Sequence, residues 1–259
     1  MSSILKRGES TTSNEKRLPK KKKKEINYVH CFGNEENEFL DALTLGTSIM
    51  ELLNHLLYVR SQVPMPLVML SQMMDRKKQT VNKNPLIATK ATKKETSVHN
   101  LSLITKSIRK LFALHPVRKI ALILGSTTIS PKETFLIRLD SELTDICQNK
   151  HSMDRPNGSI VRRFLRGFVT NEALNDLQSI RPQSIHILFS LDDFYELDED
   201  LGSIFIPKAN YRVPSRGVIH HIDVCLNELG AEDNFLDELS LDSGHWYAAN
   251  LTAKGFREN

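Results

Sequence analysis

The residue types best suited to chemistry are histidines and an acid near the end of the chain. His220 and His221 are adjacent, Asp223 follows two positions later, and His186 lies upstream. Histidine and carboxylate are the usual ligands of catalytic zinc. The alternating pattern around them predicts a strand, so the two histidines point to opposite faces and only His221 and Asp223 share one. Two ligands do not make a zinc site, and the sequence therefore predicts no bound metal.

Other reactive groups lack the context that catalysis needs. Ser215 has no GxSxG surroundings, and the glycines form no phosphate-binding loop. The acids crowded into residues 192–200 lack the spacing and central glycine of a calcium-binding loop. Cys31, Cys147 and Cys225 are far apart without a CxxC pair, which favours reduced thiols in an intracellular protein. We expect no cofactor and no enzymatic activity.

The charge is divided unevenly along the chain. The net charge is +4, but residues 1–24 hold nine Lys or Arg and two Glu, so the rest carries 26 basic against 29 acidic residues. A mildly acidic folded part disfavours a nucleic-acid partner. No apolar run reaches the ~18 residues of a membrane span. Residues 1–26 are predicted to be disordered, and their basic clusters indicate either a nuclear import signal or a solvated charge run: Lys16, Arg17, Lys20, Lys21, Lys22, Lys23 and Lys24.

The remaining chain, residues 27–259, reads as one α+β domain with helices packed on an antiparallel sheet. Apolar residues at helical spacing predict helices over 41–60, from Pro66 to about Met74, over 101–115, and from Ser159 to about Leu177. Alternation or apolar runs predict strands over 117–125, 134–139, 184–191, 218–226 and 246–251. Residues 75–99 are polar and basic, which is typical of a long loop.

The predicted helix over 159–177 is apolar on more than the one side a core requires. Arg162, Arg163 and Arg166 lie among its apolar residues. Such a helix is either deeply buried or offers a second face to a partner. Arginine beside aromatic residues is the usual composition at the centre of a protein interface, so we favour the partner.

The stretch 206–217 is predicted to be extended and displayed. Tyr211 and Val213 are two apart and share one side of an extended chain. Pro207 and Pro214 bracket the run and donate no hydrogen bond to a sheet. The stretch therefore belongs to a sheet edge or to a connection that crosses the sheet.

Several of these segments, taken in order, resemble the Mad-two-binding "comet" protein family, which are HORMA-domain adaptors that silence the spindle checkpoint. The similar blocks cover about half of the folded part and are residues 51–66, 122–133, 161–166 with 173–178, 207–217 and 251–258. The resemblance implies a HORMA fold, in which three helices back a sheet and a carboxy-terminal safety belt of strands follows. It also implies that residues 246–257 form a self-ligand strand, including Trp246, Leu251 and Phe256.

The resemblance further implies adaptor activity. Such a protein binds closed Mad-two side by side and presents it to the Pch-two AAA+ ATPase, so that mitotic checkpoint complexes come apart. The energy comes from ATP used by the partner ATPase, so this chain itself needs no catalytic group. The implied location is nucleus and cytoplasm, with spindle or kinetochore in mitosis. The implied Mad-two contacts are Val59, Arg162, Phe164, Leu165, Arg166 and Phe168, and the implied ATPase contacts are Pro207 and Lys208.

Two positions depart from the family pattern. Val59 replaces a glutamine of vertebrate members, and Leu165 replaces a phenylalanine. Both keep an apolar surface that can be buried, so we expect the contact to persist. Two other functions stay open, namely a HORMA adaptor of meiotic axes or DNA repair, and an enzyme that uses His221 and Asp223 with a metal.

Overall fold

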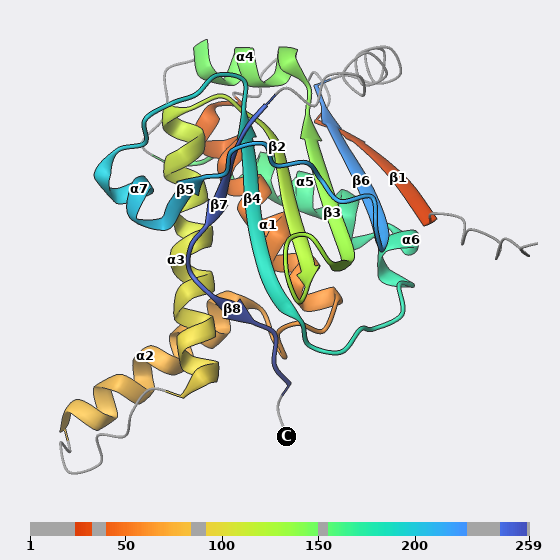
Figure 1. Ribbon diagram of the computed structural model, residues 1–259. Helices are drawn as coiled ribbons and strands as arrows, with labels where there is room; N and C mark the ends of the chain where they lie inside the picture. The colour runs from red at the N-terminus through yellow and green to blue at the C-terminus, as the bar shows by residue number, and fades with distance from the viewer. Residues whose placement is uncertain (1–23, 33–39, 84–91, 150–154, 227–243, 258–259) are drawn as a thin grey trace, which may run out of the picture.

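The computed structural model describes residues 24–32, 40–83, 92–149, 155–226 and 244–257. An eight-stranded sheet forms its centre, and helices cover one of its faces (Figure 1). The strands are β1 Lys24–Cys31, β2 Val117–Gly125, β3 Pro131–Leu139, β4 Ser184–Leu191, β5 Phe205–Pro207, β6 Val218–Cys225, β7 His245–Ala249 and β8 Ala253–Lys254. The helices are α1 Ala42–Val59, α2 Leu67–Lys83, α3 Lys93–Leu114, α4 Ser141–Asn149, α5 Gly158–Val169, α6 Glu172–Asn175 and α7 Glu199–Ile204.

The sheet confirms the α+β class but is mixed rather than antiparallel. Its strand order is β1-β6-β3-β2-β4-β7-β5, and β8 pairs with β4. The hairpin of β2 and β3 and the pairing of β2 with β4 are antiparallel, as expected. The chain reaches β6 through a long connection across the sheet, and β6 is therefore parallel to β3 and to β1.

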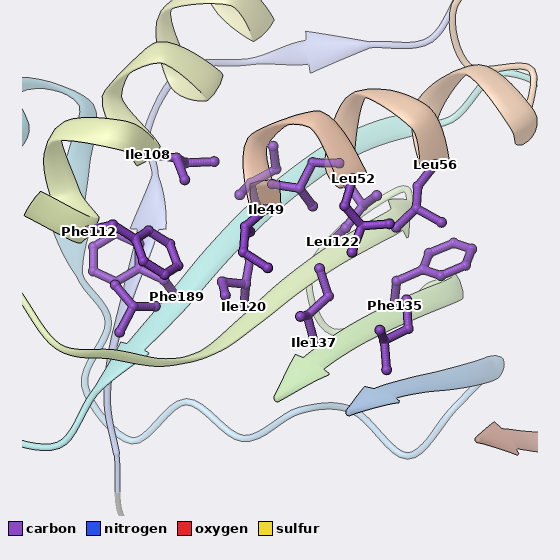
Figure 2. Packing of buried hydrophobic residues seen from close by; sticks show 14 of the residues in the cluster. Ile49, Leu52, Leu56, Ile108, Phe112, Ile120, Leu122, Phe135, Ile137 and Phe189 are labelled. Carbon is purple, nitrogen blue, oxygen red and sulfur yellow. The ribbon is translucent and has the colours of Figure 1, made fainter. Parts of the chain in front are cut away.

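The main core lies between the helices and the sheet (Figure 2). Ile49 and Leu52 of α1 and Phe112 of α3 point toward the sheet, where they meet Ile120 and Leu122 of β2. These strand residues alternate with Ala121 and Ile123, which face the other way. The buried stripe on α1 is the one its helical spacing predicts.

The predicted loop over 75–99 is wrong. The second helix, α2, continues past Met74 to Lys83, and α3 begins at Lys93. Within the stretch 75–99, only residues 84–91 lie outside the described part of the chain. A capping box starts α3, in which the Thr92 hydroxyl accepts from the Glu95 N–H and the Glu95 carboxylate accepts from the Thr92 N–H. Polar residues on the exposed side of a helix produce the same composition as a loop.

Other expectations need correction or lie outside the described residues. The strand β1, which the sequence did not indicate, begins at Lys24, so the predicted disordered tail of residues 1–26 is too long by three residues. Residues 1–23 lie outside the described part of the chain, and they include every residue of the basic clusters except Lys24. Cys225 is disulfide-bonded and Cys147 is a buried thiol, so the prediction of three reduced thiols is wrong for Cys225. Among the described residues, no helix is long and apolar enough to span a membrane.

The stretch 206–217 lies at a sheet edge and then crosses the sheet, as its prolines predict. The short strand β5 forms one edge of the sheet, and the chain then crosses the face opposite the helices to reach β6 (Figure 1). Tyr211 packs edge-on against Trp246 with ring centroids 5.3 Å apart, and both belong to a second apolar cluster on this face. Gly217 ends the crossing at φ +82°, where a Cβ would lie 2.7 Å from the Lys132 carbonyl oxygen. Only glycine fits there.

Candidate functional site

The helix α5 is shorter than its sequence pattern predicts. Its N-cap is Asn157, whose side chain accepts from the Ser159 N–H, rather than Ser159 itself. The helix ends at Val169, and a separate short helix, α6, follows after Asn171 caps its start. The predicted helix over 159–177 is therefore two helices, because the side chain of Asn171 accepts from the Leu174 N–H and starts a new turn.

The inner side of α5 is firmly packed. Phe164 and Phe168 are 1% and 2% exposed, and their rings surround His30 of β1, each with its centroid 4.9 Å from that of His30. Gly167 leaves room for His30, since a Cβ there would lie 2.4 Å from the imidazole ring. Burial, with a smaller contribution from the Arg163 charge, lowers the pKa of His30 to about 4. Phe164 and Phe168, which are predicted among the partner contacts, therefore offer almost no surface in this structure.

The outer side of α5 is open. Arg162 and Arg166 are exposed one helical turn apart, Leu165 between them is partly buried, and Val169 is 50% exposed. Residues at spacings of three and four lie on one face of a helix. The arginines therefore lie beside an apolar strip, Leu165 and Val169, that runs to the end of α5.

The last turns of α1 extend this surface. At the start of the two helices, the Asn157 N–H donates to the Thr44 hydroxyl of α1 at 3.0 Å. At the other end, the guanidinium of Arg60, which follows α1, donates to the carbonyl of Leu177, which follows α6, at 3.1 Å. The two helices therefore run in the same direction, and the end of α5 lies toward the end of α1. Tyr58 is 47% exposed there, and Val59 is partly buried. We call Tyr58, Val59, Arg162, Leu165, Arg166 and Val169 the α1–α5 face.

A buried polar network anchors this end of α1 to the sheet. The Arg60 Nε donates to the Glu133 carboxylate at 2.8 Å, and the other carboxylate oxygen lies 2.8 Å from Nε2 of His220. All three side chains are at most 4% exposed. The Tyr28 hydroxyl, 3.4 Å from Nδ1 of His220, joins β1 to the network. A buried charge stays in place only when it is paired and hydrogen-bonded, so the network holds α1, β3, β6 and β1 in one arrangement.

Pro207 and Lys208 lie on the opposite side of the sheet from this face. Pro207 ends β5 and is exposed, and the Lys208 N–H donates to the Trp246 carbonyl at 2.7 Å. The Lys208 ammonium donates to the Thr128 hydroxyl at 2.9 Å and lies 5.4 Å from the centre of the Tyr211 ring. A side chain held in this way is presented in one orientation rather than as a mobile surface charge.

The histidine and acid pattern near the chain end has a structural explanation. His220 is fully buried within the Glu133 network, and both oxygens of the Asp223 carboxylate accept from the Arg138 guanidinium, at 2.5 and 2.6 Å. Within the described ranges, no three His, Cys, Asp or Glu residues are close enough to hold a metal ion. His221 and Asp223 thus lie on β6 of the central sheet, where the Asp223 carboxylate is paired with Arg138.

The chain end is tied to several elements. Trp246 is buried on the far face of the sheet, while Leu251 and Phe256 are partly buried against the main core. Gln62, fully buried after α1, accepts at its backbone carbonyl from the Phe256 N–H and at its side chain from the Gln183 N–H. The end of the chain therefore closes over the elbow between α1 and α2.

Three features were not predicted from the sequence. Tyr58 and Val169 are exposed apolar residues whose helical positions, next to the predicted contacts, could have indicated them. His30 lies in a stretch that carries no strand signal beyond a short alternation. Arg60, Glu133 and His220 are separated by 73 and 87 residues, and no local pattern joins them.

Comparison with known proteins gives this surface a context. A family model described as "p31comet: Mad1 and Cdc20-bound-Mad2 binding" matches residues 45–258, which is most of the chain. The chain belongs to the p31comet family. The match contains the whole α1–α5 face and Lys208, and it begins beyond β1.

Two similar proteins are named for a binding partner. The chain is 28% identical over 213 residues to the MAD2L1-binding protein of Mus musculus, covering 80% of this chain and 72% of the relative. It is 26% identical over 214 residues to the MAD2L1-binding protein of Homo sapiens, covering 80% and 73%. The predicted resemblance to a Mad2-binding family is thus confirmed.

Proposed function

We propose that this chain is an adaptor that binds the closed, ligand-trapping form of Mad2 through the α1–α5 face. The observation that carries the proposal is the two-sided packing of α5. Its inner side is fixed by Phe164 and Phe168, and its outer side presents Leu165 and Val169 beside the exposed Arg162 and Arg166. Membership of a family described as binding Cdc20-bound Mad2 supports this assignment.

The composition of the face suits a protein interface. Specific interfaces bury roughly 800 Å² on each partner and combine an apolar centre with a polar rim. Tyr58, Val59, Leu165 and Val169 supply the apolar part, and Arg162 and Arg166 supply the rim. The rigid packing beneath α5 means that little conformational entropy is lost when the partner docks.

We also propose that Pro207 and Lys208 contact a Pch-two-type AAA+ ATPase while Mad2 occupies the other side of the sheet. The exposed proline and the fixed lysine ammonium support this role. The two surfaces face opposite ways, so one chain can bind both proteins together. The ATPase supplies the energy that opens Mad2, mitotic checkpoint complexes come apart, and this chain acts without catalysis.

The chain end supports a further part of the proposal, a HORMA-type safety belt whose residues 246–257 act as a self-ligand. The strand β7 lies between β4 and β5 and completes the sheet where a bound peptide would otherwise pair. We propose in addition that the amino-terminal basic clusters direct nuclear import and that the protein reaches the spindle or kinetochore in mitosis. Loss of nuclear entry on deletion of residues 16–24 tests the import signal.

The experiment that tests the adaptor role is a reconstitution with purified full-length chain, Cdc20-bound Mad2 and the ATPase. The three proteins are expected to co-purify with slowly hydrolysed ATP, and Mad2 is expected to be released from Cdc20 only when the chain, the ATPase and ATP are all present. Lys208→Glu is expected to keep Mad2 binding and lose the ATPase. Release of Mad2 at the same rate without this chain would contradict the proposal.

A further inference from the structure

A hollow opens beside Lys208 on the face of the sheet away from the helices. Its volume is about 380 Å³, at the lower end of the range for ligand pockets. The hollow, called the Lys208 hollow below, is lined by the turn Ser126–Thr128, by His186 and Leu188 of β4, by Pro207 and Lys208, and by Ala248 and Ala249.

An interruption in strand pairing coincides with the hollow. The ladder between β4 and β7 ends at Leu188 and Ala248, and pairing of β4 resumes only with β8, at Ile185 and Ala253. His186 thus lies where neither β7 nor β8 pairs with β4, between the two ladders. The position of the gap is therefore fixed by the register of the strands rather than by a mobile loop.

The polar groups of the hollow are arranged to donate hydrogen bonds. The Thr127 hydroxyl oxygen accepts from the Ser130 N–H at 3.1 Å, and the Thr128 hydroxyl oxygen accepts from the Lys208 ammonium at 2.9 Å. Each hydroxyl therefore keeps its own hydrogen for another acceptor. The Lys208 ammonium has three N–H donors, and Thr128 takes one of them.

The charge of the hollow has one sign. Among its lining residues within the described chain, Lys208 is the one lysine or arginine and none is acidic. Burial lowers the pKa of His186, against hydrogen bonding to the backbone of Gly125, and the charge of Lys208 lowers it further, which disfavours a second positive charge in the hollow. A site with donors, one positive charge and no carboxylate fits a singly charged group that only accepts hydrogen bonds.

We propose that the Lys208 hollow receives the carboxylate of an aspartate or glutamate from the partner that docks on Pro207 and Lys208. The carboxylate would accept from the Lys208 ammonium and the Thr127 and Thr128 hydroxyls, while Leu188 and Ala248 contact its aliphatic stem. A single lysine favours a carboxylate over a doubly charged phosphate, which proteins usually bind with arginine clusters. This inference rests on the proposed ATPase contact and adds the chemistry that recognises it.

The test measures the affinity of the ATPase for the full-length chain bound to Mad2. Thr128→Val and Thr127→Val remove hydroxyl donors while keeping side-chain shape, and each is expected to weaken ATPase binding about tenfold, as the loss of a hydrogen bond to a charged group does. Thr252→Val, at an exposed threonine outside the lining, is the matched control and is expected to bind as the unmodified chain does. Thermal unfolding of every variant checks that the fold is retained.

The outcomes separate this inference from the proposed function. If Lys208→Gln leaves ATPase binding unchanged, the proposed ATPase contact is wrong. If Lys208→Gln weakens binding but both threonine variants bind normally, the contact stands and the carboxylate site is overturned. If Lys208→Gln and both threonine variants all weaken binding, the carboxylate is located by changing each Asp and Glu of the ATPase docking domain to Asn or Gln, and the correct one is expected to show no further loss with Lys208→Gln. Binding that vanishes after phosphatase treatment of the ATPase would overturn the proposal in favour of phosphate.

Discussion

The α1–α5 face and the Lys208 hollow lie on opposite sides of one sheet and are built by different means. The face consists of the outer sides of two helices whose inner sides fill the core, so its shape depends on core packing. The hollow consists of a turn, a strand gap and a crossing segment, and its polar groups are fixed by hydrogen bonds between those parts. Apolar area serves a broad contact, whereas fixed donors serve recognition of one group.

This difference predicts that a substitution can disrupt one of the two surfaces and leave the other intact. A change beneath the helices should disturb the α1–α5 face before it disturbs the hollow, and a change of one hydroxyl should affect the hollow alone. The variants below are ordered from the largest expected effect to the smallest.

Arg60→Met should cause the largest loss of stability. It leaves the Glu133 carboxylate buried without its cation, which costs roughly 3–5 kcal/mol of unfolding free energy. The double variant Arg60→Met with Glu133→Gln removes the orphaned charge, and chemical denaturation should show that it recovers part of the loss. A single variant as stable as the original chain would mean that the network does not anchor α1.

Phe164→Ala and Leu165→Ala separate the inner from the outer side of α5. Phe164 is 1% exposed, so its truncation should cost roughly 3–5 kcal/mol, whereas Leu165→Ala should cost about 1 kcal/mol. Denaturant titration measures both values. Equal losses would show that α5 is packed differently from the structure, with Leu165 as deeply buried as its neighbour.

The stability of the helix side should also depend on pH through His30. Its pKa is lowered from 6.5 to about 4, so the unfolded chain takes up a proton that the folded chain refuses. The stability due to neutral His30 is present above pH 6.5 and is lost as the pH falls toward about 4. His30→Leu should flatten this part of the pH profile of unfolding. An unchanged profile would contradict a partly buried imidazole that resists protonation.

Changes at the arginine rim should have the smallest effect. Arg162→Ala combined with Arg166→Ala should slow association with Mad2 a few-fold at low salt and less at high salt, because exposed charges mainly steer the encounter. Arg216→Ala, at an exposed arginine near the end of the sheet crossing, is the control. Stopped-flow or surface-based kinetics at two salt concentrations measure the difference. A loss of binding that salt does not change would give the arginines a buried role.

The sequence predicted the elements with strong periodicity. The stripe on α1, the hairpin of β2 and β3, and the bounds of β4 follow from spacing alone. The strand β1 was missed because it continues directly from a basic run, and α2 was cut short because its second half is polar.

The candidate site was predicted in part. Arg162 and Arg166 marked the outer side of α5 correctly, since charged residues at that spacing share a solvent face. The burial of Phe164 and Phe168 was not predicted, because the aromatic cluster with His30 joins segments far apart in the chain. The gap that forms the Lys208 hollow depends on strand register, which no local pattern of residues specifies.

The central claim, that Mad2 docks on the α1–α5 face, is tested most directly by one binding measurement. Val59→Asp combined with Leu165→Asp puts two carboxylates into the proposed contact, and burial of an unpaired charge there costs several kcal/mol. The matched control is Val68→Asp combined with Leu114→Asp, at apolar positions that are 53% and 51% exposed elsewhere on the helices. We predict that the first variant folds normally and no longer co-purifies with Cdc20-bound Mad2, while the control still does. A folded first variant that binds Mad2 as well as the control would contradict the account.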